Sequence, residues 1–391
     1  MPGTYRVAIF GLGGISRRHL SGYQAPENAE RVQLVAGADV SAEARQRFTE
    51  EIGVERTFAD YRELLAQEQP EVVSVCTWPP LHPEMVEAAC AAGAKAILCE
   101  KPMAVDLAGC DRMIAAAERS GTLLVIGHQR RLQPKFTRAR ELIEGGAIGQ
   151  PELFCGIANG DLLTDGTHTV DALRFFAGDA PVSWVMGTVD LRPRDVRPQM
   201  VGRVGFQAPQ AGERFTTRYG HPVDCGAVAM LAFEGGTRAT LELGIAARPG
   251  YQRFILYGTD GAIKLSGDRP AEGEPLLQVR RRGSPDWEVV EGVDEANGFT
   301  REITLLLDAL DHGTPHPLNA RAARATQEVL IAIYESARQP GRIELPLTIS
   351  HSPLADLLNR AAVDDPTSAA SHPPTPASQS TVPVAERSTA R

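Results

Sequence analysis

"YRVAIFGLGGIS", residues 5–16, decides the fold of the first third of the chain. A mainly apolar run leads into Gly11, and the residues that follow match Gly-x-Gly-x-x-Gly/Ala with Ser16 in the third position. A glycine turn between a strand and a helix lets the backbone bend sharply and approach a pyrophosphate, which the free N–H groups of the helix N-terminus bind. Glycine turns also serve packing alone, but the position of this one favours dinucleotide binding. The predicted contacts are Gly11, Gly13, Gly14 and Ile15.

The first 130 residues alternate short apolar runs with amphipathic helical stretches. Strands are predicted at 5–10, 32–38, 72–76, 95–99 and 122–127. This alternation indicates βαβ units and a parallel sheet, and nearly continuous apolar strands agree because such a sheet is buried on both faces. We therefore expect residues 1–130 to form a Rossmann domain with a doubly wound parallel sheet.

Beyond residue 150 the pattern changes to longer β-like runs. They include "VSWVMGTVDL", "AVAMLAFEGGTRATLELG" and "RFILYGTDGAIKLSG", of which the last two turn on Gly-Gly and Asp-Gly as hairpins do. Two helices, at about 296–312 and 319–338, close the folded part. We expect an α+β domain at 131–350, built on a mostly antiparallel sheet. Residues 351–391 are predicted to be a mostly disordered tail, because Pro, Ser, Thr and Ala dominate from Asp365 onward.

Composition excludes several classes of protein. A chain of 391 residues is too long for one comfortable core, which agrees with two domains. The formal net charge of −9 argues against a nucleic-acid surface. The six cysteines show no paired spacing, so we expect a reducing compartment and no metal site. With neither a signal peptide nor a run of membrane-spanning length in view, a cytoplasmic location is expected.

Polar residues follow several predicted strands at their carboxyl ends, where doubly wound sheets bind ligands. Asp39 ends the second strand, and a carboxylate there accepts hydrogen bonds from the adenosine ribose and repels a 2′-phosphate. NAD is therefore favoured over NADP, which stays open. A turn-forming aspartate before a helix is the alternative, and Arg45, one helical turn on, could still meet a phosphate.

The stretch "KAILCEKPMA", residues 95–104, places Glu100 and Lys101 at the end of a core strand. A solvated strand end is the ordinary explanation for such a pair. The glycine turn, Asp39, the stretch "TWPPLH" (77–82) and this pair nevertheless converge on one rim of the sheet. A lysine beside a cofactor can have its pKa lowered by desolvation and can transfer protons. We predict that Lys101 is catalytic.

The longer stretch "TWPPLHPEMVEAACAAGAKAILCEKPMA" resembles the signature of the Gfo/Idh/MocA oxidoreductases, the glucose–fructose oxidoreductase and inositol dehydrogenase family. The resemblance continues through "VIGHQRR" and "ILYGTDGAIKLSG" and covers roughly residues 5 to 350. It implies a Glu-Lys-Pro motif in the Rossmann domain and an open-faced sheet with helices on one face in the second. An uncovered sheet face suits a homo-oligomer.

The resemblance also implies a catalytic Asp-x-x-x-His element early in the second domain. "GDLLTDGTHTVDALRFFAG" supplies His168, but Thr164 stands where the family usually has the carboxylate, so Asp165 is the candidate in its place. From the residues alone, a histidine beside an apolar helical stripe is more often structural than catalytic. Asp171 with Arg174 reads most simply as an ion pair on that helix.

Further contacts are predicted around the rim. Thr77, Trp78 and Pro79 would form a wall beside the cofactor, where Trp78 either covers the nicotinamide or simply packs. His82 would either cap the helix that it opens or contact the cofactor. Glu100 would contact the cofactor and orient its loop. Gln129 and Arg130 would read substrate hydroxyl groups. The loop "TTRYGHPVD" (216–224) would reach into the cleft at the domain junction or serve a subunit contact.

Together these features predict an NAD(P)-dependent oxidoreductase that acts on a sugar, a polyol or a related hydroxy compound. A substrate hydroxyl would lose its proton to His168 or Lys101 while the adjacent C–H passes hydride to the nicotinamide. Two alternatives remain: an NAD-using glycoside hydrolase or lyase with transient oxidation, and a non-catalytic sugar- or dinucleotide-sensing protein on the same fold.

Overall fold

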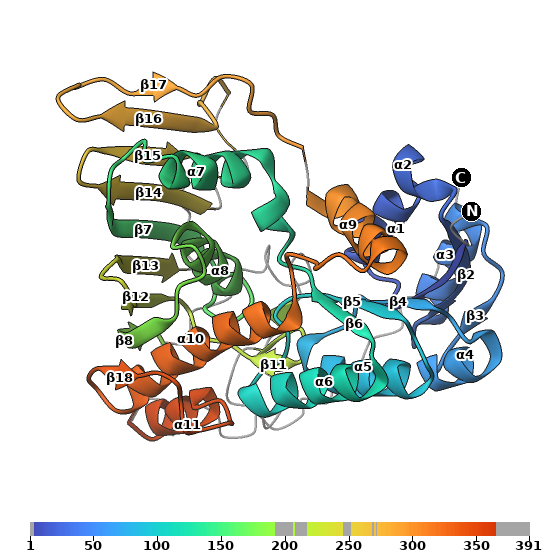
Figure 1. Ribbon diagram of the computed structural model, residues 1–391. Coiled ribbons are helices and arrows are strands. Elements are labelled where there is room, and N and C mark those ends of the chain that lie inside the picture. The colour runs from blue at the N-terminus through green and yellow to red at the C-terminus, as the bar shows by residue number, and fades with distance from the viewer. Residues whose placement is uncertain are drawn as a thin grey trace, which may run out of the picture.

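A computed structural model of the chain describes residues 4–191, 206–207, 217–244, 252–267, 270, 272–296 and 298–364. Two large sheets lie apart, and helices fill the space between them (Figure 1). The first sheet is built from the N-terminal residues and the second from residues 151–344.

The N-terminal sheet is parallel and, within the described residues, has six strands in the order β3-β2-β1-β4-β5-β6. The strands are β1 (Tyr5–Phe10), β2 (Val32–Ala38), β3 (Thr57–Phe58), β4 (Val72–Val75), β5 (Ala96–Cys99) and β6 (Leu123–Ile126). This is the doubly wound order, and it confirms the predicted fold class. The strand order reverses between β1 and β4, which is where such sheets bind ligands.

Helices cover both faces of this sheet. They are α1 (Ser16–Tyr23), α2 (Pro26–Ala29), α3 (Ala42–Ile52), α4 (Tyr61–Glu68), α5 (His82–Ala91) and α6 (Leu107–Ser120), with a 3₁₀ turn, η1, at Pro79–Leu81. Their starts follow capping rules: the side chains of Ser41, Asp60 and Asp106 accept backbone N–H groups of the first turns of α3, α4 and α6. Gly53 and Gly121 end α3 and α6 in the left-handed conformation.

The second sheet is mostly antiparallel, as expected. Its order in the described part of the chain is β17-β16-β15-β14-β7-β13-β12-β8-β18, and β7 with β13 is a parallel pair. The strands are β7 (Pro151–Asn159), β8 (Val182–Val189), β12 (Ala227–Phe233), β13 (Arg238–Gly244), β14 (Gln252–Gly258), β15 (Gly261–Leu265), β16 (Leu277–Arg281), β17 (Glu288–Val289) and β18 (Ile343–Glu344). A small separate sheet holds β9 (Phe206–Gln207), β10 (Thr217–Arg218) and β11 (His221–Pro222).

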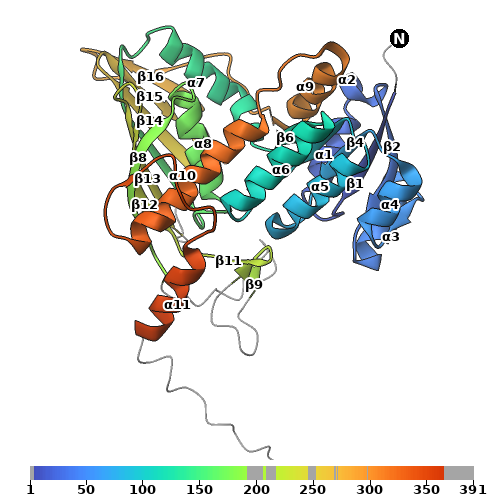
Figure 2. The ribbon, with the colours of Figure 1, turned by 60° about the horizontal axis from the view of Figure 1, so that its bottom comes forward.

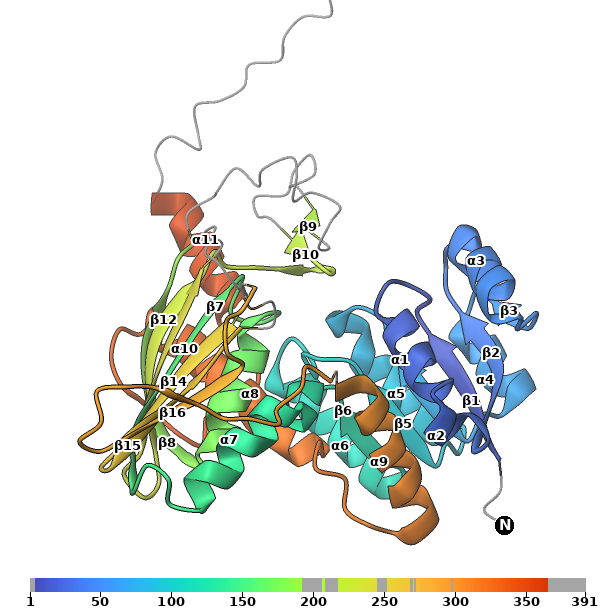
Figure 3. The same cartoon turned by 90° about the horizontal axis from the view of Figure 1, so that it is seen from above.

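Among the described residues, helices cover one face of the second sheet and no helix lies on the other (Figures 2 and 3). The covering helices are α7 (Pro134–Glu144), α8 (Gly166–Phe176) and α10 (Ala320–Arg338), preceded by a 3₁₀ turn, η2, at Gln129–Leu132. Phe136 and Phe176 stack at 5.7 Å between centroids, and Phe254 of β14 meets Phe176 edge-on at 5.4 Å. Apolar side chains remain exposed on the sheet: Ile157, Met186, Val228 and Met230.

The closing helices divide between the two sheets. Helix α9 (Gly298–His312) packs against α1, and its Ile303, Leu306 and Leu307 join the core of the Rossmann domain rather than that of the second domain. Helix α10 starts beside β6 and ends beneath the second sheet. The expectation that residues 131–350 fold as one separate unit is therefore too simple, because α9 belongs structurally to the N-terminal layer.

The expected tail begins later than residue 351. Helix α11 (Leu354–Asp364) packs against α10, and its Leu354, Leu357 and Leu358 are buried in the second core. The prediction of disorder was wrong for this segment, because these leucines recur at helical spacing and give the helix an apolar face. Residues 365–391, where the compositional signal is strongest, lie outside the described residues.

Candidate active site at the domain junction

The glycine turn has the geometry that a pyrophosphate needs. Gly11 has φ +82°, and a Cβ there would lie 2.7 Å from the carbonyl oxygen of Cys76. A Cβ at Gly13 or Gly14 would meet nothing within 4 Å, so the space in front of these residues is open. No side chain caps the N-terminus of α1, which begins at Ser16 directly after them. The turn therefore offers backbone N–H groups to an anion, and it fits a dinucleotide.

Asp39 lies at the end of β2 and is fixed to the same turn. Its Oδ2 accepts the Leu12 N–H at 2.8 Å and its Oδ1 accepts the Ser41 N–H at 2.8 Å. The Arg45 guanidinium donates to the backbone carbonyls of Asp39 (2.6 Å) and Val40 (3.2 Å). The Asp39 carboxylate thus lies beside the glycine turn, whereas the Arg45 guanidinium is hydrogen-bonded to backbone carbonyls.

The loop after β4 carries the partly exposed side chain of Trp78 and is followed by a fully buried histidine, His82. Trp78 is 44% exposed, and Gly220 of the β10–β11 loop approaches its ring closely. His82 is fully buried: its Nδ1 lies 3.1 Å from the Pro102 carbonyl oxygen and its Nε2 lies 3.1 Å from that of Thr77. Its side chain caps no helix, so the capping expectation was wrong. Burial lowers the pKa of His82, and the ring ties two loops together.

Glu100 and Lys101 follow β5, as predicted, but they point to different surroundings. Glu100 is buried; its Oε1 lies 2.9 Å from His19 Nε2, and its Oε2 accepts the Lys101 N–H at 3.2 Å. The Lys101 Nζ donates to the carbonyl oxygen of Thr164 in the second domain at 3.2 Å. Burial lowers the pKa of the Lys101 ammonium, and the negative charges of Glu100 and Asp165 counter this in part.

His168 lies in the first turn of α8, on the other side of the junction. Its ring is buried, and its Nδ1 has no hydrogen-bond partner among the described residues. Burial, and then the positive charges of Arg130 and Lys101, hold the pKa of His168 well below its usual value. His128 lies beside it at 6.0 Å between ring centroids, and burial lowers the pKa of His128 to about 4. Both imidazoles are therefore neutral at neutral pH.

The carboxylates of Asp161 and Asp165, near His168, pair with Arg218 of β10. The Arg218 Nη1 lies 2.6 Å from Asp161 Oδ2 and also bonds Asp165 Oδ2. Asp161 Oδ1 in turn accepts the Thr164 N–H at 2.7 Å. The loop at 217–224 therefore reaches the junction, which was one of its two expected roles. Asp165 pairs with Arg218, a partner that the sequence analysis did not identify.

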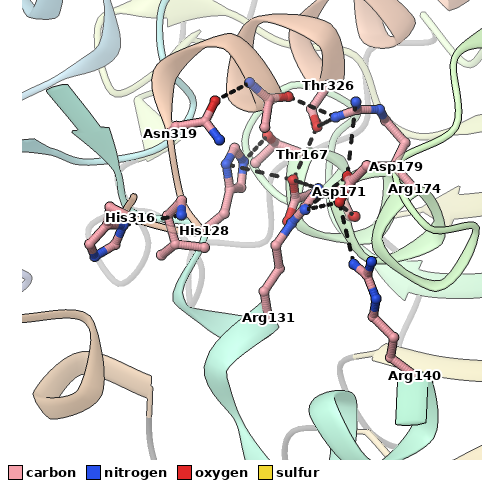
Figure 4. Close-up of polar contacts among 12 residues, drawn as sticks. His128, Arg131, Arg140, Thr167, Asp171, Arg174, Asp179, His316, Asn319 and Thr326 are labelled. Atoms are coloured by element: carbon pink, nitrogen blue, oxygen red, sulfur yellow. Dashed lines mark hydrogen bonds and ion pairs between the residues drawn. The ribbon is translucent and has the colours of Figure 1, made fainter. Parts of the chain in front are cut away.

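A buried ion pair anchors α8 (Figure 4). Asp171 pairs with Arg131, whose Nε lies 2.6 Å from Asp171 Oδ2 and whose Nη2 lies 2.8 Å from Oδ1. The predicted pair with Arg174 was wrong, because that guanidinium donates to the Ala322 carbonyl (2.7 Å) and to Thr326 Oγ1 (2.8 Å) on α10. Residues of η2, α8 and α10 are thereby fixed together behind the catalytic candidates.

Gln129 and Arg130, predicted to read substrate hydroxyls, lie in η2 at the junction. The Arg130 guanidinium bonds the side chain of Gln252, which donates to Thr169 Oγ1 at 2.7 Å, one residue beyond His168. The Oε1 of Gln129 is buried with no partner in the described part of the chain. Arg130 is thus close to the His168 segment. No cluster of three potential metal ligands and no helix suited to crossing a membrane occurs among the described residues.

Comparison with known proteins agrees with both halves of the fold. Residues 5–128 match the model of an oxidoreductase family with an NAD-binding Rossmann fold, and residues 150–345 match the C-terminal alpha/beta domain of that family. A D-apiose dehydrogenase of Paraburkholderia graminis is 33% identical over 390 residues, which cover 92% of this chain and 94% of that protein. A myo-inositol 2-dehydrogenase of Thermotoga maritima is 27% identical over 274 residues, covering 66% of this chain and 74% of the relative.

Solved structures share the architecture. A levoglucosan dehydrogenase solved with NADH and levoglucosan superposes with a TM-score of 0.71 at 20% identity, over 88% of this chain and 100% of the other. At this identity the likeness concerns the fold. With both family models matched over most of its length, the chain belongs to the Gfo/Idh/MocA oxidoreductases, and its N-terminal domain is the NAD-binding Rossmann domain of that family.

Proposed function

We propose that the protein is an NAD-dependent dehydrogenase that oxidises a secondary hydroxyl, or reduces the matching carbonyl, of a sugar, polyol or related hydroxy compound. The observation that carries the proposal is a contact across the junction: the Lys101 ammonium, just after β5, donates to the carbonyl of Thr164, four residues before His168. Its charge acts on the neutral His168 imidazole of α8. The relatives named as D-apiose and myo-inositol 2-dehydrogenases support this substrate class.

The residues of the first domain would hold the cofactor. Backbone N–H groups from Gly11 to Ile15 would bind the pyrophosphate, and Asp39 would accept hydrogen bonds from the adenosine ribose. Thr77, Trp78 and Pro79 would line the nicotinamide side of the site, with His82 and Glu100 fixing the loops behind them. When bound, NAD supplies the hydride acceptor or donor, and the protein supplies position and proton transfer.

His168 and Lys101 would divide the proton chemistry. The unpartnered Nδ1 of His168 would take the hydroxyl proton as hydride leaves the carbon that bears the oxygen. The Lys101 ammonium would donate a hydrogen bond to the same oxygen and stabilise the charge that develops there. In the reverse direction His168 would return the proton. Because burial lowers the pKa of His168, the imidazole is neutral at neutral pH, and one of its two ring nitrogens is free to accept a proton.

Asp165 would act through Arg218 rather than as a direct partner of His168. Its carboxylate pairs with that guanidinium, and its backbone carbonyl accepts the His168 N–H at 3.2 Å. The Asp165–Arg218 pair would fix the N-terminus of α8 and hold the β10–β11 loop over the substrate. Gln129 and Arg130 would contribute hydrogen bonds to substrate hydroxyls.

A homo-oligomer and a cytoplasmic location complete the proposal. Met186 and Met230 face each other across β8 and β12 on the uncovered side of the second sheet, with Val228 and Ile157 nearby. An exposed apolar sheet face of this kind suits pairing with a second copy of the chain. All six cysteines are free thiols, which suits a reducing compartment.

The experiment that tests the function begins with nucleotide binding. The purified protein is titrated with NADH and NADPH by fluorescence, and a panel of pentoses, inositols and other polyols is then tested by nicotinamide absorbance. Tighter NADH binding with net reduction of NAD⁺ by a panel member would support the proposal. A folded, nucleotide-free sample that binds neither nucleotide would refute it. Turnover with retained NAD and no net absorbance change would favour a hydrolase or lyase.

A further inference from the structure

A chain of buried polar side chains leads to Glu100, and its first three members, Tyr23, Ser74 and His19, have no role in the mechanism proposed above. The Tyr23 hydroxyl lies 2.9 Å from Ser74 Oγ, which lies 3.2 Å from His19 Nδ1. The other nitrogen of His19, Nε2, lies 2.9 Å from Glu100 Oε1. These side chains are almost completely buried, although they belong to α1, β4 and the end of β5. The chain ends at the carboxylate that accepts the Lys101 N–H.

The hydrogen bonds of this chain have one consistent direction. An ionised Glu100 can only accept, so His19 Nε2 must carry a proton and donate it. In a neutral ring Nδ1 then accepts from the Ser74 hydroxyl, and Ser74 Oγ accepts from Tyr23. Burial raises the pKa of Tyr23, which keeps its hydroxyl protonated as the first donor. The direction of the whole chain thus supports a negative charge on Glu100.

Glu100 is ionised although it is buried. Burial raises the pKa of this carboxyl, but the hydrogen bond from His19 and the charge of the Lys101 ammonium outweigh burial, and the pKa of Glu100 lies below its usual value. The thiols of Cys76 and Cys99 also face Glu100, and burial keeps both protonated.

A second buried carboxyl, Glu302 of α9, lies close enough to Glu100 to feel its charge. It is fully buried, and neither of its oxygens has a hydrogen-bond partner among the described residues. Burial, and then the charge of Glu100, raise the pKa of Glu302 well above its usual value. Glu302 is therefore an uncharged acid, and Glu100 is the ionised carboxylate of this pair.

We propose that His19 is a positioning residue for the reaction: by donating to Glu100 it fixes the carboxylate that holds the Lys101 backbone and faces the Lys101 ammonium. The inference rests on the proposed function insofar as it treats Lys101 as catalytic. The other charged groups that act on the ammonium are Asp165 and Arg218 of the second domain and Arg130 of η2 at the junction. His19, in contrast, lies in α1 of the first domain and acts through Glu100 at the end of β5.

The test follows Lys101 directly, because the chain has four lysines: Lys95, Lys101, Lys135 and Lys264. With ¹³C-labelled lysine, four side-chain signals are titrated by NMR, and Lys101→Arg identifies the signal of Lys101. In His19→Leu, Glu100 loses its donor and its charge, so the Lys101 ammonium loses a counter-charge. We expect its titration midpoint to fall by about one pH unit, a tenfold loss in proton affinity. His19→Gln, whose amide can still donate to Glu100, should stay near the wild type.

Control variants separate positioning from simple packing. Glu302→Gln replaces one uncharged group by another and should leave the Lys101 midpoint unchanged. His316→Gln removes a buried histidine whose Nε2 lies 3.1 Å from the Glu302 backbone carbonyl, so it should lower Tm without moving the midpoint. Should His19→Leu fail to fold, Ser74→Ala removes the donor to Nδ1 and should shift the midpoint in the same direction by less.

The outcomes distinguish this inference from the proposed function. An unchanged Lys101 midpoint in His19→Leu, or an equal fall in His19→Gln, would overturn the positioning role whether or not a substrate is known. The NMR measurement needs no turnover, so it decides the role of His19 even if the substrate panel is negative. Where a substrate is found, His19→Leu should lower kcat more than it changes KM and should shift one limb of the pH profile of kcat/KM in the same direction as the NMR midpoint.

Discussion

The Lys101 ammonium donates a hydrogen bond to the backbone carbonyl of Thr164, 3.2 Å away, and so joins the end of β5 to the loop before α8. This loop leads within four residues to His168. Among the residues that the structure describes, Thr164 is the one acceptor within hydrogen-bond reach of the ammonium, so donors remain for a substrate oxygen. The two residues that handle protons in the proposed reaction are thus held by one contact between domains.

Replacing Lys101 should separate catalysis from cofactor binding. In Lys101→Ala we expect kcat/KM to fall by about 10²–10⁴, because a positioned proton-transfer group typically contributes that much. The dissociation constant for NADH should change little, since the glycine turn and Asp39 supply the main contacts. Lys95→Ala is the matched control, because Lys95 is an exposed lysine paired with Glu71 at 2.7 Å. Normal turnover in Lys101→Ala would remove the residue from the mechanism.

Asp39 should control both the affinity for NADH and the choice between NADH and NADPH. Asp39→Ala removes an acceptor for the ribose hydroxyls, so we expect NADH to bind about tenfold or more weakly and the preference over NADPH to shrink. Fluorescence titration with both nucleotides gives the ratio. Asp60→Ala is the control: it removes the cap of α4 and should cost about 1 kcal/mol of stability without changing the ratio. An unchanged ratio in Asp39→Ala would contradict the ribose role.

The sequence predicted the Rossmann sheet well because parallel strands are buried on both faces and read as apolar runs. It missed β7, the strand that pairs with both β13 and β14. That segment starts at Pro151 and has Gly156 in its centre, two residues that usually argue against a strand. Hydrogen bonding to strands on both sides outweighs this local preference. The sequence alone does not show which strands will pair.

The site was predicted where it depends on a strand end and missed where it depends on distant contacts. Lys101 and Asp39 follow from topology, because all carboxyl ends of a parallel sheet share one edge. Arg218 pairs with Asp165 across 53 residues, and the polarity of its loop was the available signal. His19 lies three residues after the quoted glycine stretch, on the buried face of α1 with Leu20 and Tyr23. Its acceptor, Glu100, lies 81 residues away.

Breaking the buried Arg131–Asp171 pair should cost far more stability than breaking an exposed one. Both side chains are almost fully buried, so Arg131→Leu leaves an unpaired carboxylate and should lower the free energy of unfolding by about 3–5 kcal/mol. Arg138→Leu removes an exposed partner of Glu141 and should cost about 0.5 kcal/mol or less. Urea unfolding compares the two, and adding Asp171→Leu to Arg131→Leu should restore part of the loss. Equal costs would contradict the burial argument.

Asp224 should make stability fall as pH rises toward neutrality. Burial, and then the charge of Asp161, raise the pKa of Asp224 to about 7, although it accepts the Tyr334 hydroxyl at 2.7 Å. In the unfolded chain this carboxyl titrates near pH 3.9. Between these values the folded state binds more protons than the unfolded state. The stabilisation is therefore complete below about pH 4 and is lost as pH rises through about 7.

The measurement is Tm against pH from 5 to 8 for the wild type and Asp224→Asn, a side chain of similar size that does not titrate. Within the window each pH unit should cost the wild type about 1.4 kcal/mol relative to the variant, or roughly 2 °C in Tm for a chain of this length. Tyr334→Phe removes a hydrogen bond that favours the ionised form of Asp224. The pKa of Asp224 should therefore rise in this variant, and the decline in Tm should extend to higher pH. Parallel curves for the wild type and Asp224→Asn would mean that Asp224 is already ionised across this range.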